Sequence, residues 1–240
     1  MTESMQTPAQ SNNFEFAALA EARNYRRALL RDFAPYLRGQ VLEVGAGIGQ
    51  MTAELLRLPG IEGLSSVEPE EDYCAYMRQR FPGHALHHGT VSSLPTEQSW
   101  NAIVNINVLE HIENDEEELA AYFQLLRPTR GTLCLFVPAR PEIYAPIDRD
   151  FGHFRRYTRP ELRRKLRAAG FNLLHLRYCN SIGYFAWWMT FCLLKKRTFN
   201  PASVRLFDRA IFPIVHGFES RICPPPFGQS LLSVAQAINR

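Results

Sequence analysis

The sequence has few cysteines, and their spacing excludes a small domain held together by disulfides or zinc. There are five among 240 residues, an odd number, and no two have the two-residue separation of a zinc knuckle. We interpret them as reduced residues. With 46% hydrophobic and 21% charged residues, the composition is that of a folded soluble protein rather than a disordered or collagen-like chain.

The sequence also lacks a hydrophobic run long enough to cross a bilayer. The longest run, Ile182 to Leu194, has 13 residues, whereas a membrane-spanning helix needs about 20. The N-terminal segment MTESMQTPAQSNN has neither the basic head and apolar stretch of a secretory signal nor the arginines of a transit peptide. We therefore expect a cytoplasmic protein without integral membrane topology.

Acidic residues are scarce in the C-terminal part of the chain. Residues 1–140 carry 11 Lys or Arg against 18 Asp or Glu, whereas residues 141–240 carry 16 against 6, so the net charges are −7 and +10. Seven of the basic residues lie between Arg155 and Arg167, with Glu161 as the single acid among them. This stretch is either a solvated helix face or a surface that attracts an anionic substrate, a nucleic acid or a lipid headgroup.

From Gln40 onward, short apolar or β-branched runs alternate with longer amphipathic stretches. This alternation predicts an α/β fold in a single domain, residues 1–240, with a mostly parallel sheet and helices on both faces. The predicted strands are Val41–Val44, Gly63–Val67, Ala85–His88, Ala102–Asn107, Thr132–Val137, Phe171–Tyr178 and Leu231–Ile238. The predicted helices are Phe14–Leu37, Met51–Leu58, Glu70–Phe81, Asp115–Leu126 and Pro160–Ala169.

Two segments do not fit this alternation. Residues 139–157 form a connection rich in aromatic residues and arginine, and residues 179–229 separate the last two predicted strands. Loops of that length usually act as lids or carry their own helices. We therefore expect residues 179–229 to form an inserted helical lid, or a segment facing substrate or membrane.

Three glycines follow the first predicted strand, in the segment VLEVGAGIGQMT. Gly45, Gly47 and Gly49 permit a tight turn and leave no side chain between the backbone and a ligand. The spacing is not that of a dinucleotide site, because a G-x-G-x-x-G motif would need glycine where Gln50 stands. A pyrophosphate is therefore a poor match to this turn.

Two carboxylates accompany the turn. Glu43 lies two residues before the first glycine, where a negative charge favours an ammonium group and disfavours a pyrophosphate. Glu68 ends the second predicted strand, where it can accept hydrogen bonds from both hydroxyls of a ribose, and Pro69 offers an apolar edge to an adenine. Ammonium, ribose and adenine are the recognisable parts of S-adenosylmethionine.

With these motifs the chain resembles the class I S-adenosylmethionine-dependent methyltransferases. The resemblance covers about Val41 to Gly170 and rests on an ordered set: E-x-G-x-G-x-G at residues 43–49, V-E-P at 67–69, and N-V-L-E-H-I at 107–112. It implies a Rossmann-like fold with a seven-stranded sheet and S-adenosyl-L-methionine as cofactor. It also implies that the predicted helix over residues 14–37 folds over the cofactor.

The resemblance gives individual residues roles. Glu43 and the glycine backbone would hold the methionine part, Glu68 the ribose, and residues near Asn107 would close over the methionine part. The family often has an acid after the third strand for the adenine amine, whereas this chain has Gly89, Thr90 and Val91. The candidate cofactor-binding residues are Glu43, Gly45, Gly47, Gly49, Glu68, Pro69, Thr90, Val91 and Asn107.

Glu110 and His111 follow the fourth predicted strand, at the edge of the sheet where ligands bind. They resemble part of the metal site of ubiquinone-biosynthesis O-methyltransferases. That pattern has a further glutamate where this chain has Asn107, and an amide is a poorer ligand for a hard cation than a carboxylate. We therefore expect no metal, and the alternative is that Glu110 and His111 cap local structure.

The segment from Asp148 to Tyr157, DRDFGHFRRY, is the candidate acceptor site. It places an imidazole, a phenol and two guanidinium groups after the fifth strand, and it resembles the G-H-x-R-R-Y stretch of a group of bacterial methyltransferases. Two guanidinium groups would favour an anionic acceptor, and the alternative is an Asp-Arg network that fixes the loop. The candidate catalytic residues are His111, His153, Arg156 and Tyr157.

The predicted function is methyl transfer from S-adenosylmethionine to a small or amphiphilic, anionic acceptor. One alternative is a nucleic-acid methyltransferase that uses residues 155–167, and another is a non-catalytic protein of this fold that binds a membrane surface or a partner. Trp187, Trp188 and the basic run Lys195 to Arg197 are either core packing of inserted helices or an interfacial surface for peripheral membrane contact. The sequence does not specify the acceptor atom or the oligomeric state.

Overall fold

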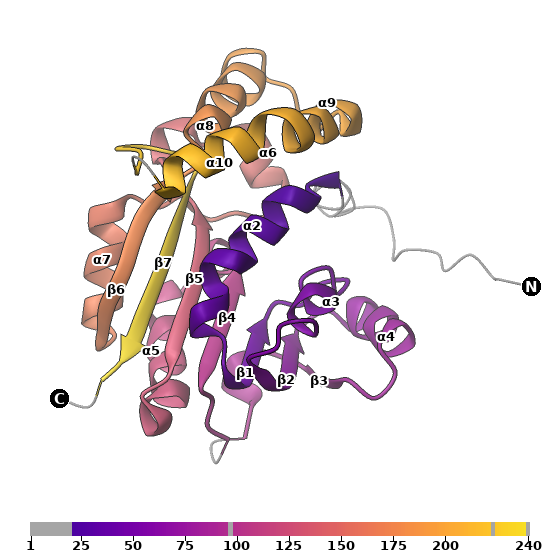
Figure 1. The fold of residues 1–240 in the computed structure, drawn as a ribbon, viewed down its shortest axis with the longest axis vertical. Helices are drawn as coiled ribbons and strands as arrows, with labels where there is room; N and C mark the ends of the chain where they lie inside the picture. Colours follow the sequence, from indigo (N-terminus) through magenta and orange to yellow (C-terminus); the bar gives the residue numbers. More distant parts are fainter. Residues whose placement is uncertain (1–20, 96–97, 222–223, 239–240) are drawn as a thin grey trace, which may run out of the picture.

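The computed structural model describes residues 21–95, 98–221 and 224–238. These residues contain a seven-stranded sheet with the order β3-β2-β1-β4-β5-β7-β6, in which β7 is antiparallel to both of its neighbours and the other strands are parallel (Figure 1). The strands are β1 (Gly39–Val44), β2 (Ile61–Glu68), β3 (Ala85–His88), β4 (Ala102–Ile106), β5 (Thr132–Pro138), β6 (Phe171–Cys179) and β7 (Ser230–Ala237). The predicted fold class is confirmed, and each predicted strand is present.

Alternate residues of the central strands pack on opposite faces of the sheet, as the two-residue period of a strand requires. In β5, Leu133 and Leu135 belong to the core cluster that includes α5 and α7, whereas Cys134 and Phe136 belong to the cluster that includes α2 and α3. Helices therefore cover both faces. These helices are α2 (Arg23–Phe33), α3 (Thr52–Leu55), α5 (Asp115–Leu126) and α7 (Arg159–Ala168), and α4 (Glu71–Arg80) connects β2 with β3.

Local sequence signals explain where several helices begin and end. The side chain of Thr158 accepts a hydrogen bond from the backbone N–H of Glu161 and caps α7. Helix α2 ends at Phe33 and continues as the 3-10 turn Ala34–Tyr36, because Pro35 has no N–H to extend the α-helical hydrogen bonds. Of the predicted helix Phe14–Leu37, residues 14–20 lie outside the described residues. Helix α3 is shorter than the predicted Met51–Leu58, since the chain turns into β2 at Ile61.

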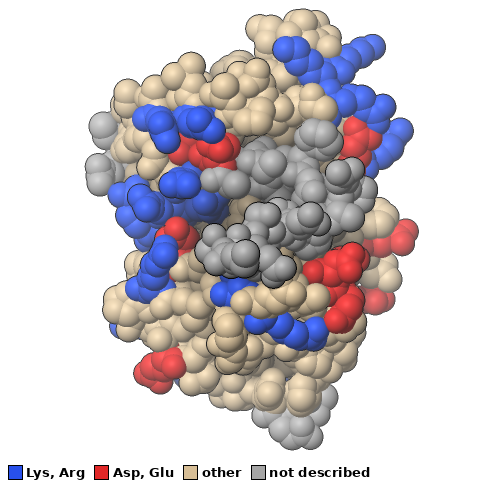
Figure 2. All heavy atoms as spheres, turned by 90° about the vertical axis from the view of Figure 1, so that its right-hand side faces the viewer, with Lys and Arg blue, Asp and Glu red and all other residues tan. Residues whose placement is uncertain are grey.

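The inserted segment between β6 and β7 is helical, as predicted, and we refer to residues 179–229 as the lid. Its helices are α8 (Ser181–Trp187), the π-helix η6 (Trp188–Leu193), α9 (Pro201–Leu206), the π-helix η7 (Phe207–Ile211) and α10 (Phe212–Arg221). These helices lie together at the carboxyl ends of the parallel strands (Figure 1). Most of the surface at that end of the molecule belongs to residues other than Lys, Arg, Asp and Glu (Figure 2). Within the described residues, no helix combines the length and apolarity needed to cross a membrane.

The two ends of the lid meet where β6 and β7 lie side by side. Asn180 Nδ2 donates to Gln229 Oε1 at 2.9 Å, and the backbone N–H of Gln229 donates to the carbonyl of Asn180 at 3.2 Å. A Cβ on Gly228 would lie 2.2 Å from the carbonyl oxygen of Cys179. The chain therefore leaves the sheet and returns to it at one closely packed point.

Candidate active site

The loop between β1 and α3 is built from three glycines with positive φ. The angle is +71° at Gly45, +54° at Gly47 and +74° at Gly49, a region that residues with a Cβ adopt rarely. A Cβ on Gly45 would lie 2.4 Å from Cγ2 of Val108, and one on Gly49 would lie 2.4 Å from Sδ of Met77. Both the backbone conformation and the close packing therefore require glycine in this turn.

A cavity of about 290 Å³ lies beside the glycine turn, close to the lower end of the range of roughly 300 to 1,000 Å³ for small-molecule sites. It is formed where β1, β2 and β4 end, which is where ligands bind in open α/β sheets. Gly45 and Gly47, Glu68 and Pro69 after β2, and Asn107 after β4 lie in its wall. The structure thus brings together five of the nine candidate cofactor residues.

Helix α2 supplies cavity residues that the sequence did not single out. Tyr25, Arg26 and Leu29 line the cavity, and so does Phe151. The ring of Tyr25 packs edge-to-face on Phe136 of β5, which fixes α2 against the sheet. The sequence predicted a helix over the cofactor, but the α2 pattern alone does not show which of its side chains face the cavity.

Glu68 is a buried carboxylate at the cavity wall. Its Oε2 accepts a hydrogen bond from the backbone N–H of Gly47 at 2.7 Å, and its Oε1 accepts one from the N–H of Glu70 at 3.0 Å. Burial raises the pKa of Glu68, and these two backbone donors act in the opposite direction. Each carboxylate oxygen has two lone pairs, so both oxygens retain acceptor capacity toward a ligand hydroxyl.

Glu43 lies behind the turn and is not part of the cavity wall. Its position in β1 directs its side chain to the face covered by α3, where its Oε2 accepts hydrogen bonds from Thr52 Oγ1 at 2.6 Å and Ser66 Oγ at 2.7 Å. Burial raises its pKa to about 7. In this position Glu43 holds the end of β1, the start of α3 and the neighbouring strand β2 together.

The residues after β3 also lie away from the cavity. Thr90 is exposed and its hydroxyl pairs with that of Ser92, whereas Val91 is buried in the core. Neither lines the cavity. Asn107 does line it, with a φ of +52° and a backbone N–H that donates to the carbonyl of Phe136 at 2.8 Å.

His111 lines the cavity. His153 packs against His111, and Asp148 in turn is hydrogen-bonded to His153. The two imidazole rings are arranged edge-to-face with their centroids 4.7 Å apart, and Nδ1 of His153 lies 3.0 Å from Oδ1 of Asp148. Burial, followed by the neighbouring His153, lowers the pKa of His111 to about 4. The His111 ring is therefore neutral near pH 7 and able to accept a hydrogen bond from a molecule in the cavity.

Glu110 is buried next to the two histidines. The potential ligand atoms of Glu110, His111 and His153 lie within 4.8 Å of one another. Two nitrogen or oxygen ligands on opposite sides of one ion would be roughly 4.2 Å apart, because such bonds are about 2.1 Å long. Separations within the 4.8 Å limit include those that one ion bridges, so these three side chains form a candidate metal-binding group.

Arg155, Arg156 and Tyr157 turn away from the cavity. Nε of Arg156 donates to Oδ1 of Asp148 at 2.8 Å, and its guanidinium stacks 4.3 Å from the centroid of the Trp187 ring. Arg155 lies 3.0 Å from Asp115, and the Tyr157 hydroxyl donates to the same carboxylate at 2.8 Å. The structure thus has the Asp-Arg network that was the alternative to direct contact with an acceptor.

Comparison with known sequences gives the family. Residues 15–176, more than half of the chain, match the family described as a methyltransferase domain. The chain belongs to this methyltransferase domain family. The match spans the glycine turn, Glu68, His111 and the Arg156 segment, and therefore includes the whole cavity wall described above.

One curated methyltransferase matches part of the chain. The "Probable S-adenosylmethionine-dependent methyltransferase" of Mycolicibacterium smegmatis is 28% identical over 139 residues, which is 55% of this chain and 52% of that protein. The chain thus spans about half the length of this relative.

Solved methyltransferase structures share the fold over almost the whole chain. An S-adenosylmethionine-dependent methyltransferase from Mesorhizobium loti has a TM-score of 0.58 at 17% identity and covers 92% of this chain and 99% of its own. The N-methyltransferase NodS from Bradyrhizobium japonicum, in complex with S-adenosyl-l-homocysteine, has a TM-score of 0.56 at 14% identity, with 94% and 98% covered. At this identity the likeness establishes the Rossmann-like methyltransferase fold.

S-adenosyl-L-methionine is the cofactor that the family and its relatives support, and the residues present fit it. Gly45 and Gly47 line the cavity without side chains, so the methyltransferase turn offers bare backbone to the ligand. Glu68 would hold the ribose with its remaining lone pairs, and Pro69 would face the adenine. When bound, the cofactor supplies a methyl group already activated on a sulfonium.

Proposed function

We propose that the protein transfers a methyl group from S-adenosyl-L-methionine to a hydroxyl or amine of a small or amphiphilic acceptor. The observation that carries this proposal is the position of His111, a neutral imidazole in the wall of the same cavity as the glycine turn and Glu68. A ligand held by the turn would thus share the cavity with a hydrogen-bond acceptor for the attacking group.

The chain contributes mainly alignment to such a reaction. Because a sulfonium methyl group is already activated, orienting the nucleophile and excluding water account for much of the rate enhancement. His111 would accept a hydrogen bond from the attacking hydroxyl or amine and remove its proton where required. His153, hydrogen-bonded to Asp148, would keep the His111 ring in place from behind.

The cavity favours an acceptor with apolar surface rather than an anionic group. Arg155 and Arg156, the basis for expecting an anionic acceptor, are each paired with a carboxylate. Tyr25, Leu29 and Phe151 instead give the cavity an apolar side. An acceptor that buries a ring or chain against these residues and presents one polar group to His111 matches this wall.

The nucleic-acid alternative has less support. Of the basic stretch 155–167, Arg156 and Lys165 are buried against Asp148 and Asp115, and Arg155 also pairs with Asp115. Ion pairs of this kind hold α7 and its preceding loop in place and are not free to neutralise phosphates. The exposed arginines that remain on α7 form a short helix face.

The test uses the cofactor carrying tritium on its methyl group. The purified protein is incubated with this cofactor and, separately, with a bacterial lipid and metabolite extract, with total RNA and with DNA. Label in organic-soluble or small-molecule products supports the proposal, and label confined to nucleic acid contradicts it. His111→Gln should lower the turnover number by roughly 100-fold, as loss of a catalytic base does, with the cofactor Kd unchanged. A protein that binds the cofactor but labels no fraction would be the non-catalytic alternative.

A further inference from the structure

Large apolar side chains are exposed mainly on the lid. Of the thirteen exposed large hydrophobic residues in the described chain, ten lie between residues 182 and 218. Single exposed apolar residues are normal on a protein surface, whereas a concentration of them marks a binding surface. The lid therefore carries an unusual share of the exposed apolar groups of the molecule.

The first lid helix, α8 continued by η6, is apolar on two opposite sides. Trp187 and Phe191 face inward and pack in a small core with Ile143 and Ile147. Phe185 and Trp188 point outward and are 56% and 44% exposed. A helix that is apolar all round is normally buried on every side. Here one side is covered by the protein, and the other still requires a cover.

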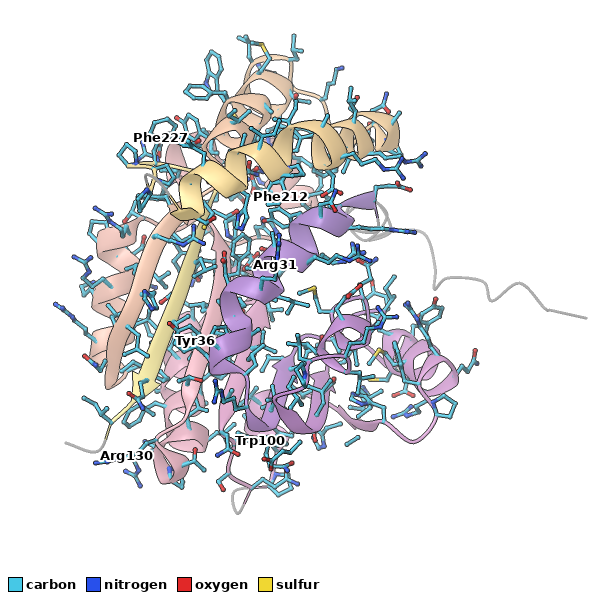
Figure 3. All side chains as sticks on the ribbon, viewed as in Figure 1. Arg31, Tyr36, Trp100, Arg130, Phe212 and Phe227 are labelled. Carbon is cyan, nitrogen blue, oxygen red and sulfur yellow. The ribbon has the colours of Figure 1, made fainter. Side chains whose placement is uncertain are left out.

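The second lid helix, α9 continued by η7 and α10, repeats this arrangement. Its buried positions, Asp208, Phe212, Val215 and Glu219, recur with helical spacing. Phe212 packs edge-to-face against Tyr25 with ring centroids 5.1 Å apart, and it points from α10 to α2 in Figure 3. Its outward apolar positions also recur with helical spacing. These are Leu206, Ile211, Ile214 and Phe218.

The charge of the lid surface has one sign. Asp208 and Glu219 are the only acids between residues 180 and 221, and each is 3% exposed. Asp208 accepts backbone hydrogen bonds from the start of α2, and Glu219 accepts them from the start of α8. Both negative charges of the lid are thereby used inside the protein.

The exposed charges of the lid are lysines and arginines. Lys195 and Lys196 directly follow the exposed Leu193 and Leu194 at the end of η6. Arg197 pairs with Asp150, and Arg205 pairs with Glu21, so these two are partly neutralised by neighbouring elements. In Figure 2, Lys and Arg side chains flank the uncharged surface at this end of the molecule.

We propose that the outer face of the lid, residues 182–218, docks on a membrane surface that contains anionic phospholipids. Exposed Trp188 would lie at the level of the headgroups, where amphipathic aromatic rings concentrate, and the apolar ring of Phe185 would enter the acyl boundary. Lys195 and Lys196 would lie over the lipid phosphates. The positive surface also disfavours contact between two copies of this face, because like charges would meet. This surface goes beyond the proposed methyl transfer and does not depend on it.

The three tryptophans of the chain provide the readout. Trp100 and Trp187 are buried, so Trp188 is the one whose surroundings would change on docking. Addition of phosphatidylcholine vesicles containing phosphatidylglycerol should shift the tryptophan emission to the blue and carry the protein into the pellet on centrifugation. Vesicles of phosphatidylcholine alone should do so much less, and added salt should reverse most of the binding.

Paired variants locate the surface. Lys195→Gln combined with Lys196→Gln should lower the partition coefficient roughly 25-fold, since each cation near an anionic surface contributes about fivefold. Leu193→Glu combined with Leu194→Glu should lower it at least as much. Leu56→Glu is the control for adding a carboxylate at an exposed leucine, because Leu56 is 50% exposed and directly follows α3, outside the lid. All variants should retain the thermal unfolding midpoint of the parent, since the replaced side chains are exposed.

Two results would overturn the proposal. One is the absence of an emission shift and of co-sedimentation with anionic vesicles. The other is a lipid-free dimer by sedimentation equilibrium that the Leu193→Glu and Leu194→Glu pair converts to a monomer, because a second copy would then cover this face.

Discussion

The carboxylate of Asp208, in the lid, accepts a hydrogen bond from the backbone N–H of Tyr25 at 2.9 Å, across 183 positions of sequence. The same carboxylate accepts the N–H of Asn24 at 3.0 Å. Residue Ala22 at the start of α2 has no side-chain oxygen to cap the helix. Asp208 therefore supplies from the lid the capping bonds that a serine or aspartate usually supplies from within the chain.

Asp208→Ala should loosen the start of α2 and, with it, the wall of the cavity. Loss of such a cap costs about 1 kcal/mol, and Tyr25 and Arg26 both line the cavity. We expect a lower unfolding midpoint and weaker binding of S-adenosylhomocysteine by calorimetry. Arg205→Ala is the control, because its ion pair with Glu21 is exposed and contributes little. If both variants bind S-adenosylhomocysteine equally well, the contact of Asp208 with α2 does not contribute to the cofactor site.

Glu68→Ala should weaken cofactor binding by about 1 to 3 kcal/mol, because it removes the acceptor for the ribose hydroxyls. It should also lower stability, since the N–H groups of Gly47 and Glu70 lose their partner. Calorimetric titration with the cofactor measures the first effect and thermal unfolding the second. Binding of a nicotinamide dinucleotide in place of S-adenosylmethionine by the unmodified protein would contradict the cofactor assignment.

Two buried groups should make opposite contributions to the pH dependence of stability. Burial lowers the pKa of His111 to about 4 from 6.5, so between these values the unfolded state binds more protons and stability rises with pH. Burial raises the pKa of Glu43 to about 7 from 4.5, so in that window the folded state binds more protons and stability falls as pH rises. From pH 4.5 to 6.5 the two contributions oppose each other.

Single variants should separate these contributions. In Glu43→Gln the stability should rise with pH across the window, and in His111→Asn it should fall, each by at most about 1.4 kcal/mol per pH unit. Urea unfolding at several pH values measures the slope. The same slope in both variants would mean that neither group titrates as its burial indicates.

Arg156→Ala should act on stability rather than on the acceptor alone. The change leaves Asp148 buried without its guanidinium partner, and breaking a buried ion pair in this way costs about 3 to 5 kcal/mol. Thermal unfolding should show the loss, together with weaker cofactor binding. Arg163→Ala, at an exposed position on α7, should change neither. A higher acceptor KM with unchanged stability would instead place Arg156 in contact with the acceptor.

Methyl transfer should not require a metal ion. Asn107 occupies the place of a third anionic ligand, and an amide is a poorer ligand for a hard cation than a carboxylate. Activity should therefore survive treatment with a chelator. If activity disappears and magnesium restores it, Glu110, His111 and His153 become the candidate ligands.

Much of the fold follows from local sequence signals. Strand β3 and helix α5 have the predicted bounds, since Asn114 with four following acids marks the start of α5. The glycine turn and Glu68 were also predictable, because their positions depend on neighbours close in sequence. The antiparallel direction of β7 could not be predicted in this way, since it depends on the path by which the chain returns from the lid to the sheet.

The acceptor side was less predictable because its contacts are long-range. Nothing near Arg155 in the sequence indicates that it pairs with Asp115, 40 positions earlier. For Arg156, the sequence allowed either contact with an anionic acceptor or an ion pair within the loop, and the structure has the ion pair with Asp148. The side chain of Glu43 points away from the cavity because α3 packs on that face of β1, and the sequence does not show on which face α3 packs. These ion-pair partners and side-chain directions depend on packing between elements that are distant in sequence, and residue type alone does not determine them.

The hydrogen bonds between Asn180 and Gln229 determine how the lid can vary in length and sequence. Because the chain leaves and rejoins the sheet at one point, the lid is topologically a single long hairpin loop between two antiparallel neighbours. Its length and surface can be exchanged without altering the register of any strand. An exchanged lid must reproduce two attachments, the hydrogen bonds from Asp208 to α2 and the packing of Trp187 against Arg156 and Ile143.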